Sequence, residues 1–422
     1  MARPISWDIY EEHLDEAAWL WGKWEESLDS AVYALGDAAV GPEERLLAHL
    51  DGLVLGGQPV ARKLLVPALT SDDLGGIAAA AWALTQAEDA DHQDTVIGAL
   101  ASAESSACAA VGRALYLAPR ADLSRLVPLW NTGAPPVRAI VFDAFGPREP
   151  GWVRANIEPA LRSGQPPLIV AALRAVRNAR ERVFLDHVQV ALQSEDAEVR
   201  REAMSTGLAL GVRTAWSVCR TFAGAPGDFC RFPLGLLATS HDPNDRAFVR
   251  GRAMDAEVGR HALWALGFAG DAESAEVLVR AMSDEKTAKV AGEAFSAITG
   301  LAIVGPLVKP GVTEGPNAEE VESDDPPPVV RSEDSLSEPR VEAVKKWWDR
   351  ERAHFRSGSR FIHGQPRNPE TLRAALTAAA TWRREILSIE LAASMASPPK
   401  VALPNVDLKA WARDQLKQLG AR

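Results

Sequence analysis

The sequence has 422 residues, of which 47% are hydrophobic and 24% are charged, which is ordinary for a folded protein and allows several domains. Its 46 Lys and Arg residues against 57 Asp and Glu give a formal net charge of -11, which argues against general binding to nucleic-acid backbones. The three cysteines are odd in number and far apart, so we expect a reducing compartment and no disulfide framework.

Membrane and export signals are missing from the sequence pattern. No run of residues approaches the about 20 apolar positions that a membrane-spanning helix needs. The N-terminal residues also lack the apolar stretch of a signal peptide. We therefore expect a cytoplasmic protein without a membrane span.

The first helix is expected within residues 11–30, EEHLDEAAWLWGKWEESLDS, which contain three tryptophans. At about 100° per residue, Trp21 and Trp24 fall on one stripe with Leu14 and Leu28, which is typical of a helix face packed into a core. We expect residues 1–42 to form helices that cap the N-terminal end of a larger array.

Trp19 lies on the opposite, charged face of the same expected helix. Either another part of the chain covers this side chain, or it is an exposed anchor for a binding partner. Coverage within the chain is the interpretation that we favour, and partner binding is the alternative.

Residues 43–304 carry a repeat of roughly 31 residues, seen as two interleaved series of apolar residues. The first series comprises Leu55, Leu84, Leu115, Phe145, Val176, Leu210, Leu237, Leu266 and Ile298. The second series comprises Leu69, Leu100, Leu129, Leu161, Leu192, Met254 and Met282. Two series of similar period mean two helices per unit, so we predict an all-α fold, a HEAT-like α-solenoid of antiparallel helix pairs.

The resemblance to HEAT-type repeats is clearest in residues 257–301, EVGRHALWALGFAGDAESAEVLVRAMSDEKTAKVAGEAFSAITGL. An irregular helical bundle is the alternative, but two series of apolar residues would not keep a nearly constant spacing over so many repeats by chance.

Two polar features inside the repeats are candidates for function. Arg174, Arg177 and Arg180, followed by Arg182, form a basic cluster that offers contacts to a partner. Asp143 lies inside an expected repeat helix, where an acid is costly unless it is paired or faces a groove. A structural salt bridge is the favoured explanation for this acid. The alternative is that it serves a HEAT-like DNA glycosylase as catalytic carboxylate, together with the arginine cluster.

Histidine supplies no recognisable catalytic or metal motif, because none of the eight occurs as His-x-x-x-His or His-Glu. The missing His-Glu pairs set aside the deoxyhypusine hydroxylases, which share a HEAT-like architecture and bind iron through such pairs. His13 and Glu16 share a helix face, but two ligands do not make a metal site. Phosphate-binding loops, nucleophile elbows and a cofactor ligand of the HEAT-like bilin lyases are not found either. We expect no catalytic residue, no cofactor and no metal.

The C-terminal part changes in character after the repeats. Residues 305–340 are acidic and rich in proline, so we expect a flexible linker, with a docking strip for a basic partner as the alternative. Residues 341–422 have helical periodicity without the repeat. We expect this C-terminal helical segment either to cap the last repeat or to fold back along the solenoid.

Three stretches, EEHLDEAAWLW, ERLLAHLDGLVLGG and KKWWDRERAHFRSGSRFIHGQP, resemble an uncharacterised family of proteobacterial HEAT-repeat proteins. Members are often encoded beside type VI secretion genes, which implies an accessory or immunity role. We therefore expect a non-enzymatic protein-binding scaffold or adaptor of such a system, with a secretion component or effector as partner. The candidate contacts are Trp19, Arg174, Arg177 and Arg180.

Overall fold

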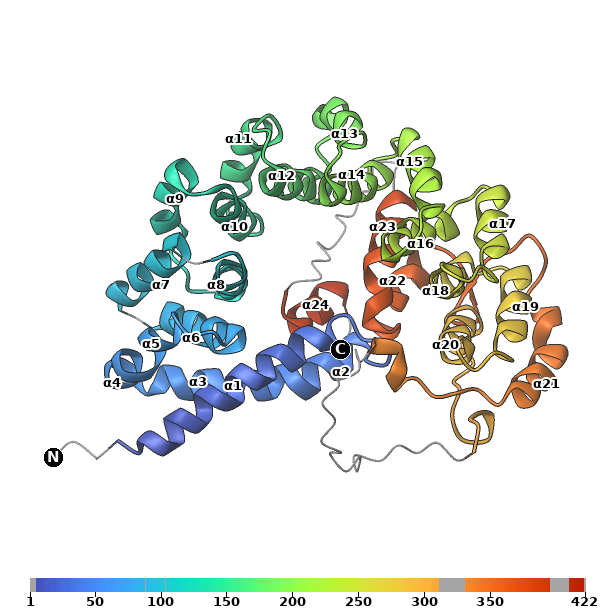
Figure 1. Ribbon diagram of the computed structural model, residues 1–422, viewed down its shortest axis with the longest axis horizontal. Coiled ribbons are helices and arrows are strands. Elements are labelled where there is room, and N and C mark those ends of the chain that lie inside the picture. The colour runs from blue at the N-terminus through green and yellow to red at the C-terminus, as the bar shows by residue number, and fades with distance from the viewer. Residues whose placement is uncertain (1–4, 88, 103, 311–330, 395–409, 421–422) are drawn as a thin grey trace. The chain divides into compact units, whose positions relative to one another are not determined.

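Helices account for nearly all of the ordered elements in the computed structural model, which describes residues 5–87, 89–102, 104–310, 331–394 and 410–420. Figure 1 shows them as a succession of short helices joined by tight turns. Within these ranges, extended chain is confined to a two-residue hairpin, β1 (Phe361–Ile362) with β2 (Gln365–Pro366), and to two isolated bridges. The all-α fold predicted from the sequence is confirmed.

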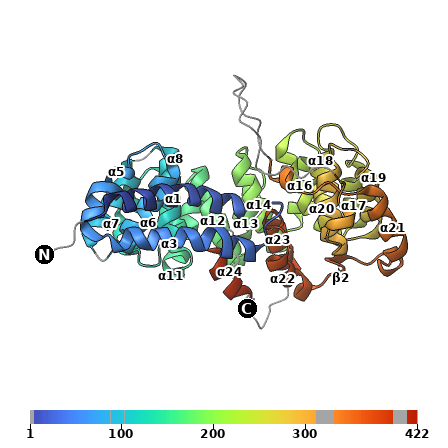
Figure 2. The same ribbon diagram turned by 90° about the horizontal axis from the view of Figure 1, so that it is seen from below.

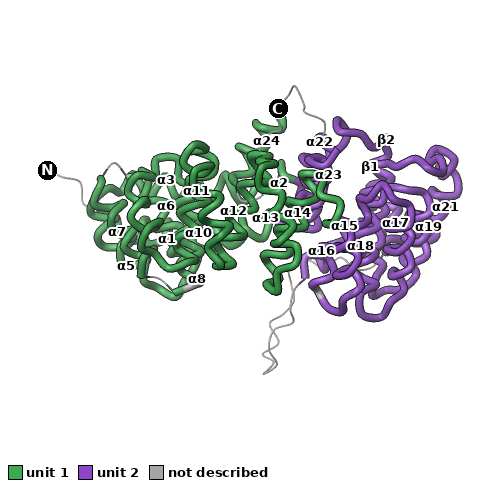
Figure 3. The backbone as a smooth tube through the Cα atoms, turned by 90° about the horizontal axis from the view of Figure 1, so that it is seen from above, with its two compact units in different colours: residues 1–28, 35–215, 396–422 green, residues 29–34, 216–395 purple. Residues whose placement is uncertain are grey.

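The chain divides into two compact units (Figure 3). Unit 1 takes the described residues within 1–28, 35–215 and 396–422, and unit 2 takes those within 29–34 and 216–395. These boundaries differ from the four segments expected from the sequence. The expected N-terminal cap and the first repeats share unit 1, and the expected C-terminal segment, 341–422, is divided between both units.

Unit 1 contains a row of long helices in which each packs against the next (Figure 1). The row consists of α1 (Trp7–Ser27), α6 (Leu74–Gln86), α8 (Ser105–Leu117), α10 (Pro135–Phe145), α12 (Pro166–Ala179) and α14 (Ala197–Ala209).

A second row of helices covers one side of the first. It consists of α3 (Glu44–Leu55), α5 (Val66–Ala68), α7 (Ala90–Ser102), α9 (Val127–Thr132), α11 (Pro150–Leu161) and α13 (Leu185–Ala191). Shorter elements complete unit 1: α2 (Leu35–Ala38), η1 (Ala39–Glu43), α4 (Gly57–Val60), η2 (Ala61–Leu65), η3 (Leu123–Leu126), η4 (Arg182–Phe184) and α24 (Ala412–Leu419). Helix α7 packs against both α6 and α8, and α11 packs against both α10 and α12, which is the two-layer packing of a HEAT-like solenoid.

Small residues let the helices of the first row approach each other closely. Gly75 of α6 faces the backbone of α1, where a Cβ atom would lie 2.2 Å from the Ala18 carbonyl oxygen. Gly112 of α8 faces Ile140 of α10, where a Cβ atom would lie 2.8 Å from the side chain. Real Cβ contacts are longer than this, so the spacing of these helices requires glycine at both positions.

The two apolar series of the sequence correspond to the two rows. From Leu84 to Leu210 the first series lies in or directly after helices of the first row, and its later members lie in the corresponding helices of unit 2; all of these are buried. Leu55 is the exception, because it ends α3 of the second row. Two members of the series are not part of the core, because Leu55 is 85% exposed and Met254 is 83% exposed. Leu55 is the last residue of α3, and Met254 lies in the turn three residues after the end of α17, so a register counted along the sequence overshoots the buried face at both places.

Arginines close the C-terminal ends of first-row helices. The last carbonyl groups of a helix lack partners within the helix and carry partial negative charge. Arg120 donates to the Gln86 carbonyl oxygen at 3.2 Å, and Arg148 donates to the Tyr116 and Ala118 carbonyl oxygens at 2.7 and 2.8 Å. Each arginine therefore links one repeat to the preceding one.

The N-terminal helix α1 lies beside α3 and α6 and closes the first end of the row (Figure 1, Figure 2). Trp21 and Trp24 are buried, as expected from their stripe. Their indole rings lie 6.1 and 4.8 Å, between centroids, from that of Trp411, which immediately precedes α24. The closure of this end thus uses residues from both ends of the sequence.

Unit 2 continues the same architecture with its own row, α16 (Arg231–Thr239), α18 (Gly259–Ala269) and α20 (Ala288–Thr299). Its second row consists of α17 (Pro243–Gly251) and α19 (Ala272–Ala281). Helix α15 (Thr214–Ala223) lies at the boundary between the units, and η5 (Asp228–Cys230) precedes α16.

The C-terminal segment of unit 2 folds back along its repeats. It comprises η6 (Gly305–Leu307), η7 (Ser332–Ser335), α21 (Val341–Glu351), η8 (Arg352–His354), α22 (Pro369–Ala378), η9 (Thr381–Arg383) and α23 (Arg384–Ser394). Arg360 donates to the Thr239 and Ala269 carbonyl oxygens at 2.9 and 2.8 Å, at the ends of α16 and α18. Both arrangements left open by the sequence occur. Helix α21 covers the last repeat, where Trp347 and Trp348 lie 5.9 and 5.6 Å, between ring centroids, from Phe295 of α20, whereas Arg360 and α23 lie along the earlier helices α16 and α18.

Much of the expected linker, residues 311–330, lies outside the described residues. The described flanks meet each other: Val308 forms a bridge with Pro339, and Lys309 pairs with Glu338 at 2.7 Å. Among the described helices, none is both long and apolar enough to cross a membrane.

Candidate functional site

The polar residues singled out in the repeats form a ladder of ion pairs across three adjacent helices of unit 1. Arg174 of α12 donates to Asp143 of α10 at 2.6 Å. Arg177, one turn further along α12, pairs with Glu202 of α14, and Arg174 also lies 3.9 Å from Glu202. We call these four residues the ion-pair ladder.

The low exposure of its side chains indicates that the ion-pair ladder has a structural role. The side chain of Glu202 is only 7% exposed and lies between two arginines, an arrangement that compensates the cost of removing its charge from water. Asp143 and Arg174 retain 29% and 23% exposure and reach the same pocket. The salt bridge favoured for Asp143 is present, and it links α10 to α12.

Arg180 is not part of the ion-pair ladder, and its side chain instead contacts the end of a helix. It adopts a left-handed conformation, with φ of 53°, directly after α12. Its guanidinium donates to the Ala209 carbonyl oxygen at 3.3 Å, and Arg182 donates to that of Leu210 at 2.9 Å. Burial, and secondarily the charge of Arg182, lowers the pKa of Arg180. The cluster RAVRNARERVF is therefore used largely within unit 1.

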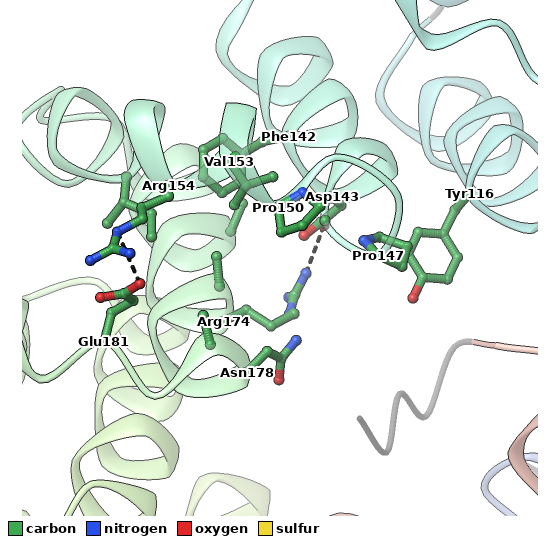
Figure 4. A pocket seen from close by; sticks show the side chains of 16 residues that line it. Tyr116, Phe142, Asp143, Pro147, Pro150, Val153, Arg154, Arg174, Asn178 and Glu181 are labelled. Atoms are coloured by element: carbon green, nitrogen blue, oxygen red, sulfur yellow. Dashed lines mark hydrogen bonds and ion pairs between the residues drawn. The ribbon is translucent and has the colours of Figure 1, made fainter. Parts of the chain in front are cut away.

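A pocket of about 460 Å³ lies between α10, α11 and α12 (Figure 4). Phe142 and Val153 form part of its apolar wall. The pair of Asp143 and Arg174 lies on one side, and Arg154 pairs with Glu181 at 3.2 Å on another. Such a pocket offers an apolar surface between two ion pairs. The bond to Arg174 uses the Oδ2 atom of Asp143.

A second depression, of about 530 Å³, lies where α1, the start of α6 and α8 meet. We call it the Trp19 groove. Trp19 is 54% exposed, and Leu74, which also lines the groove, is 46% exposed. The favoured expectation that another segment covers Trp19 is therefore wrong. The charged face of α1 has no described element packed over it at this position, so the indole remains at the surface.

Both basic side chains that line the Trp19 groove have acidic neighbours, and Asp73, which also lines it, accepts a hydrogen bond from the Gly75 backbone N–H at 3.0 Å. Lys23 pairs with Glu26 at 2.7 Å, and Arg113 lies 3.9 Å from Glu25. Lys23 and Arg45 each lie 6.0 Å from the centroid of the Trp19 ring, which is cation–π distance. Because these cations already have acidic neighbours, a partner would bind mainly by covering the apolar surface of the Trp19 indole and of Leu74.

The cysteines and histidines add no catalytic centre among the described residues. All three cysteines are buried, and burial raises the pKa of the Cys108 and Cys219 thiols, which keeps them protonated and poorly nucleophilic. No group of three or more His, Cys, Asp and Glu side chains is assembled around a metal position in the part of the chain described here.

Sequence reasoning missed Glu202, Leu74 and Glu181. Glu202 lies 25 residues after Arg177, short of the repeat of roughly 31 residues, so the period of the sequence did not indicate this pairing. Leu74 begins a helix and belongs to neither apolar series, so only the packing of α1 on α6 brings it to Trp19.

The sequence matches no protein-family model, and it matches no curated protein.

Proposed function

We propose that this protein is a non-enzymatic protein-binding scaffold that engages its partner through the Trp19 groove. The observation that carries the proposal is the exposure of 54% of Trp19 beside the half-exposed Leu74. Tryptophan presents a large apolar area with few rotatable bonds, and exposed tryptophans in concave sites are favoured anchors of protein interfaces.

The surroundings of Trp19 support a protein partner over a small molecule. An interface anchor is most effective when matched polar groups surround it and exclude water. Here the pairs Lys23–Glu26 and Arg113–Glu25 stand around the groove, while alanines Ala109 and Ala110 provide a low floor. A partner can cover the indole without leaving one of these charges buried and unpaired.

The ion-pair ladder supports a structural role for the residues that suggested a nucleic-acid enzyme. Arg174 and Arg177 form ion pairs with Asp143 and Glu202, so these arginines are less available to phosphate groups. Together with the formal charge of -11, this favours protein binding over the DNA glycosylase alternative.

The biological setting of the proposal rests on sequence resemblance. The stretches EEHLDEAAWLW and KKWWDRERAHFRSGSRFIHGQP support a role in a type VI secretion system, as a cytoplasmic accessory or immunity protein. A secretion component or an effector is then the partner of the Trp19 groove.

The test compares Trp19→Ala with Leu55→Ala, which removes an even more exposed apolar side chain from α3 of the same unit. Partners recovered from native cells are quantified with each full-length variant, and the affinity of the recovered partner is measured with purified proteins. Loss of an anchor tryptophan costs at least about 2 kcal/mol, or about a 30-fold rise in Kd. Leu55→Ala should leave binding unchanged.

Two results would count against the proposal. Equal partner binding by Trp19→Ala and the wild type would remove the Trp19 groove from the interface. Tight, salt-sensitive binding of the purified protein to duplex DNA would instead favour the nucleic-acid enzyme.

A further inference from the structure

A groove runs along one face of α20 within unit 2. Lys289, Glu293, Ser296 and Ala297 of the helix line it, together with Gly300 directly after the helix. Their spacings of three and four residues place them on one side of α20. At a rise of about 1.5 Å per residue, the line from Lys289 to Gly300 extends roughly 16 Å. We call this elongated cavity of about 440 Å³, a volume typical of small-molecule sites, the α20 groove.

The other walls of the α20 groove come from distant segments that backbone hydrogen bonds hold in place. The backbone N–H of His363 donates to the Ala297 carbonyl oxygen at 2.8 Å, which fixes the β1–β2 hairpin against α20. Ala380, on another wall, forms a bridge with Ala34. The groove is therefore formed before a ligand arrives, which reduces the conformational entropy that binding has to remove.

Apolar side chains provide most of the groove lining. Val32 and Val304 are 53% and 64% exposed, and Leu301, Ile303 and Leu336 are half-buried in the same lining. A ligand with an apolar body that covers these side chains removes aliphatic surface from water, which favours binding in proportion to the area covered.

One lysine gives the lining a net positive charge. Of the three charged residues in the lining, Glu293 accepts a hydrogen bond from the Arg383 Nε at 2.6 Å, so these two charges compensate each other. The Lys289 Nζ donates to the Asp334 carbonyl oxygen at 2.7 Å and has no carboxylate within ion-pair distance among the described residues. Because an ammonium group carries three N–H donors, two remain for a ligand.

The position of Lys289 also favours an anion at its end of the groove. Lys289 is the second residue of α20, and the N-terminal end of a helix carries partial positive charge. His363 lines the groove near the opposite, C-terminal end, where burial lowers the pKa of its imidazole and keeps it neutral at neutral pH. We therefore expect the charged group of a ligand beside Lys289 and its apolar part further along α20.

We propose that the α20 groove binds an amphipathic carboxylate, a monoanion with an unbranched aliphatic chain. The carboxylate oxygens accept N–H groups of Lys289, and the chain lies along α20 against Ala297, Leu301 and Ile303. A single negative charge matches the single uncompensated cation of the lining, whereas a phosphate dianion would leave excess negative charge. The elongated form of the groove suits a chain better than a compact ring.

The ligand class is tested by calorimetric titration of the purified full-length protein with decanoate. 1-Decanol and decylammonium serve as probes with the same number of carbon atoms and a different charge. We expect saturable binding of one decanoate per chain, weaker binding of the alcohol and no binding of the ammonium. Octanoate lacks two CH₂ groups and should bind about 10-fold more weakly than decanoate. Absence of decanoate binding, or equal binding of the three ten-carbon probes, would overturn the proposal.

The location of the site is tested with variants. Lys289→Met removes the charge but keeps a long side chain, and it should raise the Kd for decanoate about 10-fold, whereas Lys289→Arg should retain binding. Lys286→Met is the matched control, because Lys286 is exposed before α20 and does not line the groove. Ala302→Phe introduces a ring at an exposed position of the lining and should weaken binding in a folded protein.

Unchanged decanoate affinity in Lys289→Met or in Ala302→Phe would place binding outside the α20 groove and overturn the proposal. An equal loss of affinity in Lys286→Met would show that only the overall charge matters, with the same consequence. None of these results bears on partner binding by Trp19, which belongs to unit 1.

Discussion

Glu43 is a carboxylate buried completely at the N-terminal end of unit 1. It accepts a hydrogen bond from the Trp24 indole at 2.9 Å and from the backbone N–H groups of Ala412 and Arg413 at 2.5 and 3.0 Å. Burial raises the pKa of Glu43, while these hydrogen bonds oppose that change by favouring the ionised form. The two backbone donors begin α24, so Glu43 caps a helix that lies almost 370 positions away in the sequence.

Replacement of Glu43 by alanine should destabilise the protein by about 3 kcal/mol or more, because two buried donors and one partly buried donor lose their acceptor. The neighbouring exposed residue provides the control, since Glu44→Ala should change stability by no more than about 0.5 kcal/mol. Stability is measured by urea unfolding, and amide hydrogen exchange is followed at Ala412 and Arg413. Equal effects of both variants would show that the hydrogen bonds to Glu43 contribute little.

At the scale of the element, arginines connect consecutive helices of the first row at their C-terminal ends. Arg148 is the clearest example: one of its Nη atoms lies within hydrogen-bonding distance of the Leu115, Tyr116 and Ala118 carbonyl oxygens. Burial lowers the pKa of Arg148, so its charge is held at a cost that the carbonyl groups must offset. This repeated use explains why basic residues in the repeats need not mark a binding surface.

We expect Arg148→Ala to destabilise unit 1 by about 2 kcal/mol, the scale of hydrogen bonds to a charged group. Hydrogen exchange should accelerate at the C-terminal turn of α8 before other helices respond. Arg162→Ala is the control, because Arg162 is 68% exposed and pairs with Glu158 only at the surface, where such pairs contribute at most about 1 kcal/mol. Unaltered exchange in α8 would contradict a capping role for Arg148.

At the scale of the whole molecule, the chain passes repeatedly between its two units. Residues 29–34 belong to unit 2, although the residues on both sides belong to unit 1. Within unit 2, the Ser30 backbone N–H donates to the Thr381 hydroxyl at 2.8 Å, and Ala34 forms a bridge with Ala380. The last helix, α24, returns to unit 1, where Trp411 contacts Trp21 and Trp24. Each unit is therefore completed by segments that are distant in the sequence.

Truncation of the chain after residue 409 should weaken unit 1, because it uncovers Trp21 and Trp24 and removes two donors from Glu43. Loss of the buried Trp411 alone costs about 3–5 kcal/mol. We expect a lower melting temperature and faster hydrogen exchange in α1 and α2, measured against a chain that lacks only residues 421–422. Identical melting of the two truncated chains would show that α24 does not stabilise this end.

The repeat architecture could be predicted from the sequence because the spacing of apolar residues within each helix identifies its buried face. Leu84, Leu115 and Val176 recur at nearly constant spacing, and all three are buried in first-row helices. The same logic placed Trp21 and Trp24 in a core. It did not reveal which residues would cover them, because Trp411 belongs to no repeat and carries no periodic signal of its own.

The candidate site was predicted only in part, since exposure depends on which elements pack together. Asp143 was identified as unusual because an acid in an apolar helix needs a partner, but its partner Arg174 was identified only as part of a basic cluster. The exposure of Trp19 and the meeting of His13 with His49 both depend on how α1 lies against its neighbours. No periodicity within α1 contains that information.

Local hydrophobic pattern was thus sufficient to predict the helices and their pairing into repeats, because these follow from contacts between neighbours in the sequence. The closure by Trp411 and Glu43, the groove beside Trp19 and the histidine pair exist only after folding. Each joins side chains that are tens to hundreds of residues apart, and their distances are set by the packing of whole helices, which no single stretch of the chain encodes.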